Sequence, residues 1–329
     1  MKIAILGAGA WGTALAIHLS ARHEVTLWTI DSNHLSELAL NRVNLSFFPD
    51  FPLPEGIHLT DALDEALDAA DLALVVVPIA GFRGVLQGIA KISENVPVIW
   101  GCKGFESATS KLPHQVVAEA YSGRMPCGVI SGPSFAQEVA QGLPTALTLA
   151  SEDDRFAHQM ASQLHSTNLR IYTSQDVAGV ETGGAIKNVI TIAAGISDGM
   201  GFGHNARAAL ITRGLMEITR LGLALGGKME TFMGLAGVGD LLLTCTGDLS
   251  RNRRVGLFLA EGKSLQDILS ELGHVAEGVY TAQAVLDLSR KLNVDMPITE
   301  AVCSILHEGT PARTVVERLL NREPKAEIC

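Results

Sequence analysis

The glycine-rich turn near the N-terminus constrains the fold of this chain more than any other feature. Lys2–Leu6 is a short apolar run, it ends in Gly7-Ala8-Gly9-Ala10-Trp11-Gly12, and residues 13–21 have the composition of a helix. A second strand-like run, Glu24–Trp28, follows. This alternation predicts a βαβ unit in which the glycine turn joins the first strand to the helix.

The spacing of the three glycines gives the turn a physical role. Gly7 permits a tight turn, Gly9 lets the backbone approach a pyrophosphate, and Gly12 lets the helix lie close to the strand. Phosphate oxygens can then accept hydrogen bonds from N–H groups at the start of the helix. A glycine turn without a ligand is the alternative, but its place between a strand and a helix favours dinucleotide binding.

The end of the second strand leaves the choice between NAD and NADP open. An acidic residue that binds the ribose 2′-OH is expected there, but residues 28–31 read WTID, so Asp31 comes one or two positions late. No arginine stands there to bind a 2′-phosphate, although Arg22 and His34 lie in neighbouring turns.

Alternation of strands and helices continues through the first half. Buried-strand patterns occur at residues 71–77, 96–100, 126–131, 143–150 and 169–172, and helix-like segments, including 156–164, separate them. We therefore expect an α/β fold with a mostly parallel sheet of the Rossmann type.

Two of these strands end in segments that are typical of ligand sites. Lys103 lies in the loop after the strand at 96–100, and Gly132 and Ser134 follow the strand at 126–131. Ligands of open α/β sheets bind outside the carboxyl ends of the strands, so Lys103 is a candidate site residue. Its alternative is a loop lysine in solvent, and Ser134 is also predicted to cap a helix at 135–140.

The character of the chain changes after Asp176. Long apolar segments with helical spacing recur at 179–195, 206–225, 251–261 and 281–292, and strand patterns largely disappear. We predict a dinucleotide-binding Rossmann-like domain at residues 1–176, followed by an all-α C-terminal domain at residues 177–329 that carries the substrate and catalytic site.

The first predicted helix of this second domain holds an isolated cation. Lys187 stands beside Asn188 in an apolar run, where an unpaired buried charge costs several kcal/mol. A lysine that extends along the core to reach water is one explanation, and a charge with a bound partner is the other. We place the chemistry at Lys187.

Two later motifs offer partners for this cation and for a substrate. Asp240 follows three closely spaced glycines in an apolar setting, where it either pairs with a cation or caps the next helix. Ser250, Arg251 and Asn252 open another helix, and a cap, free N–H groups and a guanidinium together suit a phosphate. A solvated basic face is the alternative and explains Arg253 or Arg254 better than Arg251.

Composition narrows the class of protein. A net charge of -10 argues against a nucleic-acid partner, and no run approaches 18 apolar residues, so we expect no membrane insertion. The N-terminus has no separate apolar segment with a cleavage site, which favours a cytoplasmic protein. Five scattered cysteines without metal-ligand spacing predict reduced thiols and no metal site.

Taken in order, these motifs closely resemble those of bacterial NAD(P)-dependent glycerol-3-phosphate dehydrogenases over nearly the whole chain. The matching segments are GAGAWGTALA from Gly7, CKGFE from Cys102, ISGPSFAQEVA from Ile130, IKNVITIAAGISDGMGFGHNARAALITRG from Ile186, GLAGVGDLLLTCT from Gly234, SRNRRVG from Ser250, VAEGVYT from Val275 and MPITEAV from Met296. The combination is far more specific than any single motif.

The resemblance implies a function and a set of site residues. The implied reaction is the reversible reduction of dihydroxyacetone phosphate to sn-glycerol 3-phosphate with NAD(P)H, for glycerophospholipid synthesis. Lys187, Lys103 and Asp240 are the implied catalytic residues. The implied substrate contacts are Lys103, Gly132, Ser134, Lys187, Asn188, Asp240, Ser250, Arg251 and Asn252. The implied cofactor contacts are Gly7, Gly9, Ala10, Trp11, Gly12, Lys103, Ala136, Arg251, Val275 and Glu277.

Two departures from the family pattern bear on the cofactor only. Ala10 stands where many relatives have a hydroxyl, and Ile30 stands where some carry a histidine or arginine near the 2′-phosphate. Both count against a preference for NADP. The resemblance also implies a homodimer formed through the helical domain.

Two other functions fit parts of the pattern. Another dehydrogenase of the β-hydroxyacid type would share the architecture and a lysine-asparagine pair, but Ser250, Arg251 and Asn252 with the compact glycine loop favour a small phosphate ester. A cofactor-sensing protein without turnover would not need Lys187, Lys103 and Asp240 together.

Overall fold

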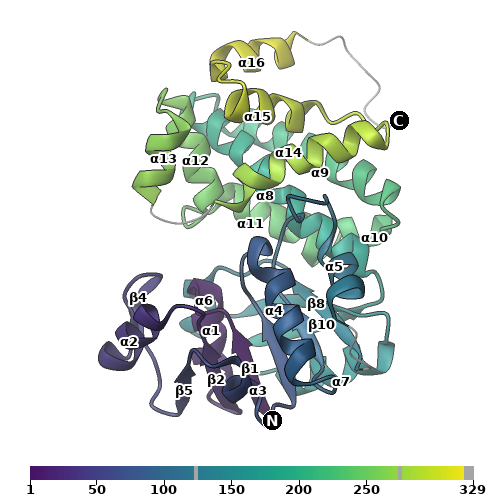
Figure 1. Ribbon diagram of the computed structural model, residues 1–329. Helices are drawn as coiled ribbons and strands as arrows, with labels where there is room; N and C mark the ends of the chain where they lie inside the picture. Colours follow the sequence, from purple (N-terminus) through teal and green to yellow (C-terminus); the bar gives the residue numbers. More distant parts are fainter. Residues whose placement is uncertain (122–124, 273–275, 322–329) are drawn as a thin grey trace.

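The computed structural model describes residues 1–121, 125–272 and 276–321 (Figure 1). Within these residues, eight strands form one sheet in the order β10-β9-β8-β7-β6-β1-β2-β5, and β3 and β4 form a small antiparallel pair. The strands are β1 Lys2–Leu6, β2 Glu24–Trp28, β3 Val43–Asn44, β4 Phe48–Pro52, β5 Ile57–Thr60, β6 Leu72–Val75, β7 Val98–Trp100, β8 Cys127–Ser131, β9 Thr145–Ala150 and β10 Leu169–Ser174.

Helices cover both faces of this sheet because alternate strand residues point to opposite sides. Ala4 and Leu6 of β1 join the core under α3, α4 and α5, whereas Ile3 and Ile5 join the core under α1 and α7. The helices of this half are α1 Ala10–Leu19, α2 Ser32–Asn41, α3 Leu63–Leu67, α4 Ile79–Ile92, α5 Pro113–Ala120, α6 Ala136–Ala140 and α7 Asp154–Leu164.

The predicted fold class, a mostly parallel Rossmann-type sheet followed by a helical domain, is confirmed. Most neighbouring strands of the large sheet pair in parallel, and β8 with β9 is the antiparallel exception among the described pairs. The sequence interpretation missed β3, β4 and β5, because two to five residues with prolines between them carry little periodic signal.

The second half is helical and is built around one long buried helix. Residues 177–197 of α8 are almost all buried, and α9, α11, α12 and α14 lie against it. Its elements are α8 Val177–Gly199, α9 Gly203–Ala224, α10 Met229–Phe232, a π-helical turn η1 Leu235–Gly239, α11 Asp240–Thr246, α12 Arg251–Ala260, α13 Leu265–Leu272, α14 Glu277–Lys291, α15 Pro297–His307 and α16 Ala312–Leu320.

Figure 1 shows the sheet with its covering helices in one half of the molecule and the helices from α8 onward in the other. The Asp176 carboxylate accepts a hydrogen bond from the N–H of Gly179 and so caps α8 just after the last strand. The domain limits 1–176 and 177–329 stay a prediction. Among the described residues no single helix is both long and apolar enough to cross a membrane.

Candidate active site

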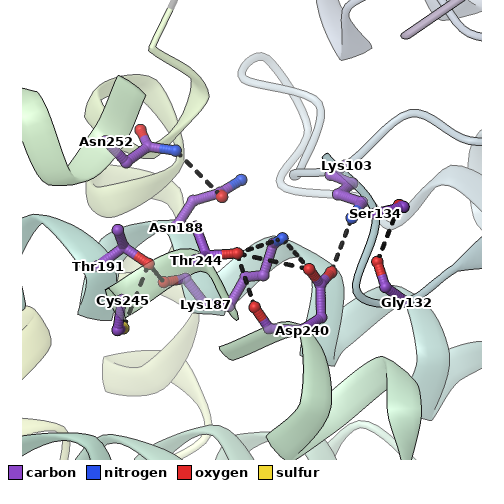
Figure 2. A network of polar contacts seen from close by, with 10 residues as sticks. All are labelled: Lys103, Gly132, Ser134, Lys187, Asn188, Thr191, Asp240, Thr244, Cys245 and Asn252. Carbon is purple, nitrogen blue, oxygen red and sulfur yellow. Dashed lines mark hydrogen bonds and ion pairs between the residues drawn. The ribbon is translucent and has the colours of Figure 1, made fainter. Parts of the chain in front are cut away.

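Two lysines and one aspartate from three distant segments meet where the sheet half adjoins the helical half. Lys187 of α8 donates to Oδ1 of Asp240, and Lys103, from the loop after β7, donates to Oδ2 at 2.7 Å (Figure 2). The Lys187 side chain is 7% exposed and that of Asp240 is 1% exposed. Lys187 is therefore paired in the interior instead of extending to the surface, and Lys103 is not a free loop lysine.

The backbone around Asp240 is shaped to reach α8. A π-helical turn runs from Leu235 to Gly239 directly before Asp240, and such turns are frequent at functional sites. Gly183 of α8 allows this turn to approach, because a Cβ there would lie 2.5 Å from the carbonyl oxygen of Ala236. Asp240 is the first residue of α11, and its carboxylate binds the two lysines, so the capping alternative is wrong.

Thr244 completes the surroundings of Lys187. Its Oγ1 accepts a hydrogen bond from Lys187 Nζ at 2.9 Å and donates to the carbonyl oxygen of Asp240 at 2.6 Å. The sequence interpretation missed Thr244, although it lies one turn after Asp240, a spacing that brings two side chains to the same face of a helix.

The electrostatics of the cluster depend on two cations and one anion. Burial and, to a smaller extent, the nearby Lys103 outweigh the opposing effect of Asp240 and lower the pKa of Lys187 to about 8. Burial acts to raise the pKa of Asp240, but the two ammonium groups outweigh it, so the pKa lies below its ordinary value. Lys187 is therefore able to exchange a proton near neutral pH.

A polar bridge beside this cluster connects α8, α12 and α14. Asn252 donates from Nδ2 to Oδ1 of Asn188 at 3.1 Å (Figure 2). Its own Oδ1 accepts from the N–H of Gly278 at 3.1 Å. This arrangement fixes the first turn of α12 next to the residue that follows Lys187.

The residues predicted to form or flank an anion site at the start of α12 differ in their exposure and in their partners. Ser250 caps the helix as predicted, since its Oγ accepts from the N–H of Arg253, and Arg251 is exposed. Arg253 is not part of a solvated face: its guanidinium donates to Asp198 at 2.7 Å and to Asp248 at 2.9 Å, and 14% of its side chain is exposed. Arg251 and Arg254 are thus the exposed guanidinium groups of this motif, whereas Arg253 is held by two carboxylates.

Glu277 lies in the first turn of α14, close to these charges. Burial raises its pKa, and the charge of Arg251 opposes the rise, so the two side chains lie within electrostatic reach. The predicted cofactor residue Val275 lies outside the described residues.

Gly132 and Ser134 follow β8 on the sheet side of the cluster. Ser134 donates to the carbonyl oxygen of Gly132 at 3.1 Å, and both lie near Lys103 (Figure 2). The predicted capping role of Ser134 is wrong, because Phe135 stands at the cap position of α6 and no side chain caps that helix. The hydroxyl group instead stabilises the turn at Gly132.

The glycine-rich turn has the shape that a dinucleotide requires. Gly7 has a φ of +122°, and a Cβ on Gly12 would lie 1.9 Å from the carbonyl oxygen of Gly7, so both positions need glycine. No atom lies within 4 Å of a Cβ built on Gly9, and no side chain caps α1, which begins at Ala10 and Trp11. The open space and uncapped N–H groups fit a pyrophosphate. Ala136 begins α6, which lies against α1.

The end of β2 holds no free cation from the predicted candidates. Arg22 donates to the carbonyl oxygen of His165, and His34 is buried between Thr29 and Asn44. The Asp31 carboxylate caps α2 through the N–H of Asn33 at 2.9 Å. In the part of the chain that the structure describes, no three acidic, histidine or cysteine side chains meet as a metal site requires.

The chain is similar in sequence and in fold to known proteins. Family models of the N-terminus and the C-terminus of NAD-dependent glycerol-3-phosphate dehydrogenase match residues 2–157 and 176–317. The glycerol-3-phosphate dehydrogenases [NAD(P)+] of Nitrosospira multiformis and Nitrosomonas eutropha are 65% and 62% identical, over 100% and 99% of both chains. The crystal structure of glycerol-3-phosphate dehydrogenase from Coxiella burnetii is similar with a TM-score of 0.94 at 44% identity, covering 98% of this chain and 99% of that one.

Proposed function

Because the chain belongs to the NAD-dependent glycerol-3-phosphate dehydrogenase family, we propose that its chemistry takes place at the cluster of Lys187, Asp240 and Lys103. The enzyme reduces dihydroxyacetone phosphate reversibly to sn-glycerol 3-phosphate with NAD(P)H, which provides a glycerophospholipid precursor. The observation that carries the assignment is a buried lysine amine held by the Asp240 carboxylate and the Thr244 hydroxyl where the sheet half adjoins the helical half.

Lys187 acts on the oxygen of the substrate. When bound, the reduced nicotinamide supplies a hydride to the ketone carbon. Negative charge then grows on the ketone oxygen, and the protonated amine of Lys187 stabilises this charge and donates its proton. In the oxidative direction the neutral amine accepts the hydroxyl proton.

The neighbours of Lys187 orient this amine. An ammonium group has three hydrogens to donate, and Asp240 and Thr244 accept two of them, which leaves one for the substrate oxygen. Lys103 holds the other carboxylate oxygen of Asp240 and is the second cation at the substrate. The geometry supports Lys187 as proton donor, with Asp240 as the group that orients it.

The substrate phosphate is assigned to the start of α12. Ser250, Arg251 and Asn252 offer a helix N-terminus and one exposed guanidinium, which suit a dianion. The Asn188–Asn252 hydrogen bond supports a fixed distance between this site and Lys187. Gly132 and Ser134 line the opposite side of the substrate site in this proposal.

The cofactor is NAD or NADP, and we expect NADH to be preferred. A 2′-phosphate needs a cation at the end of β2. Ile30 is 81% exposed there, Asp31 carries a negative charge, and Arg22 and His34 are engaged elsewhere. Parallel steady-state assays with NADH and NADPH measure the preference, and a lower KM for NADPH contradicts it.

Substitution of Lys187 tests the catalytic assignment. Lys187→Met preserves bulk and leaves Lys103 paired with Asp240, so the variant should fold, whereas the loss of one preorganised donor costs roughly 3 kcal/mol, or about a hundredfold in kcat. Lys91→Met, at an exposed position of α4, is the matched control and should be unchanged. Turnover near that of the wild type in Lys187→Met would refute the assignment.

Family resemblance also motivates an assembly and a location. We infer a homodimer formed through the helical half, where large apolar side chains such as Met233, Leu242 and Tyr280 are exposed, and a cytoplasmic location. Light scattering after gel filtration measures the oligomeric state, and cell fractionation measures the location.

A further inference from the structure

A fully buried asparagine lies directly against the glycine-rich turn. Asn44, in the two-residue strand β3, is 0% exposed. Its Nδ2 donates to the carbonyl oxygen of Ala8 at 2.8 Å and to Oγ1 of Thr13 at 2.7 Å. Both amide hydrogens of Asn44 are therefore used, and one of them holds the Ala8–Gly9 peptide.

The orientation of this amide is determined by its partners. A carbonyl oxygen can only accept, so the group facing Ala8 must be the nitrogen of Asn44. The Oδ1 atom then accepts from the N–H of Phe47 at 3.1 Å and from Nε2 of His34 at 3.0 Å. With four hydrogen bonds, the amide has no freedom to turn.

The hydrogen bonds continue from His34 to the end of β2. Nε2 of His34 donates to Asn44, and the other ring nitrogen, Nδ1, lies 3.3 Å from Oγ1 of Thr29. A buried polar chain thus joins the end of β2, the start of α2, β3 and the glycine-rich turn. These are the segments that surround a dinucleotide in this fold.

We propose that Asn44 is a positioning residue for the cofactor, because it sets the direction of the Ala8–Gly9 peptide. In a trans peptide the C=O and the following N–H point in opposite directions, and the described residues contain no cis bond. The hydrogen bond that draws the Ala8 carbonyl inward therefore aims the Gly9 N–H outward, toward the space where a pyrophosphate would lie. Peptides beside glycine turn over easily, so the turn needs this anchor.

This inference rests on the proposed use of the glycine-rich turn in cofactor binding, and one variant tests that premise separately. Gly9 has φ -75° and ψ -177°, which alanine also adopts, and a Cβ there meets no protein atom within 4 Å. Gly9→Ala should therefore fold normally and place a methyl group in the pyrophosphate space. NADH binding equal to that of the wild type would contradict the role of the turn itself.

Asn44→Leu tests the anchor. Leucine has a similar size and cannot donate, so the Ala8–Gly9 peptide loses its fixed direction. We expect the Kd for NADH and for ADP-ribose, which both contain the pyrophosphate, to rise about tenfold, or about 1.4 kcal/mol. The KM for dihydroxyacetone phosphate at saturating NADH should stay within about twofold, because none of the four hydrogen-bond partners of Asn44 belongs to the residues assigned to the substrate.

Thr13→Val is the matched control, because it removes the other partner of the Asn44 amide and leaves the bond to Ala8. Both variants should lower Tm, but the Kd for NADH should change in Asn44→Leu alone. Equal changes in Kd in the two variants, or an unchanged Kd in Asn44→Leu, overturn the proposal. If the leucine variant does not fold, Asn44→Ser takes its place, and the same rise in Kd supports the proposal while an unchanged Kd overturns it.

Discussion

The proton on Lys187 should set the pH dependence of the reaction in both directions. The difference between its ordinary pKa of 10.5 and about 8 corresponds to roughly 3 kcal/mol by which the buried site disfavours the charged amine. At pH 7 about ten amines in eleven are protonated, and at pH 9 about one in eleven, as follows from a pKa of about 8.

In the proposed mechanism, reduction needs the protonated amine of Lys187 and oxidation needs the neutral amine. The kcat/KM for dihydroxyacetone phosphate reduction should therefore fall about tenfold per pH unit above about pH 8. The kcat/KM for glycerol 3-phosphate oxidation should rise with pH and level off above about pH 8. Phosphate monoesters lose their second proton near pH 6, so the substrate charge stays constant over this range. Steady-state assays from about pH 6.5 to about pH 10 measure both profiles.

The two charged neighbours of Lys187 should move the midpoint of both pH profiles in opposite directions. Lys103 lowers the pKa of Lys187 and Asp240 raises it. Lys103→Met should therefore shift both profiles to higher pH, and Asp240→Asn should shift them to lower pH. The ratio of rates at each pH to the maximum for that variant separates the shift from any loss of activity. Profiles that are flat, or that shift the same way in both variants, would refute the reasoning.

Two further predictions concern single side chains. Because the guanidinium of Arg251 is proposed to contact the phosphate, Arg251→Ala should raise the KM for dihydroxyacetone phosphate strongly, with a smaller loss for the unphosphorylated substrate dihydroxyacetone. Arg254→Ala, also exposed on α12, is the control, and equal losses on both substrates contradict the role of Arg251. Glu217 accepts hydrogen bonds from the N–H groups of Ile298 and Thr299 in the first turn of α15, and its burial raises its pKa from 4.5 to about 7. The charged form is therefore disfavoured in the folded state, and the free energy of unfolding should fall by roughly 3 kcal/mol as pH rises from about 4 to about 8. Thermal unfolding at a series of pH values should show this fall in the wild type and not in Glu217→Gln. The same dependence of Tm on pH in both proteins would contradict the prediction.

Local sequence alone determined the elements and the candidate residues. The run Lys2–Leu6, the three glycines after it and Glu24–Trp28 predicted β1, the turn and β2 with the observed limits, because their signals are short in range. Lys187 was identifiable for a similar reason, since one cation in a long apolar run needs a partner. Ser250 was identifiable as a cap because a hydroxyl before a helix has a simple local geometry.

Only the tertiary structure decided which residues meet. Asp240 and Lys187 are 53 positions apart, and their contact depends on a π-helical turn and on the absence of a side chain at Gly183, neither of which periodicity reveals. Arg253 is paired whereas Arg251 is exposed, and this difference likewise depends on Asp198, at the far end of α8. Asn44 lies in a strand too short to predict, and its role depends on four partners brought together by folding. Short-range patterns fix local structure, whereas buried polar contacts depend on long-range packing, because each buried donor must find its acceptor wherever the fold places it.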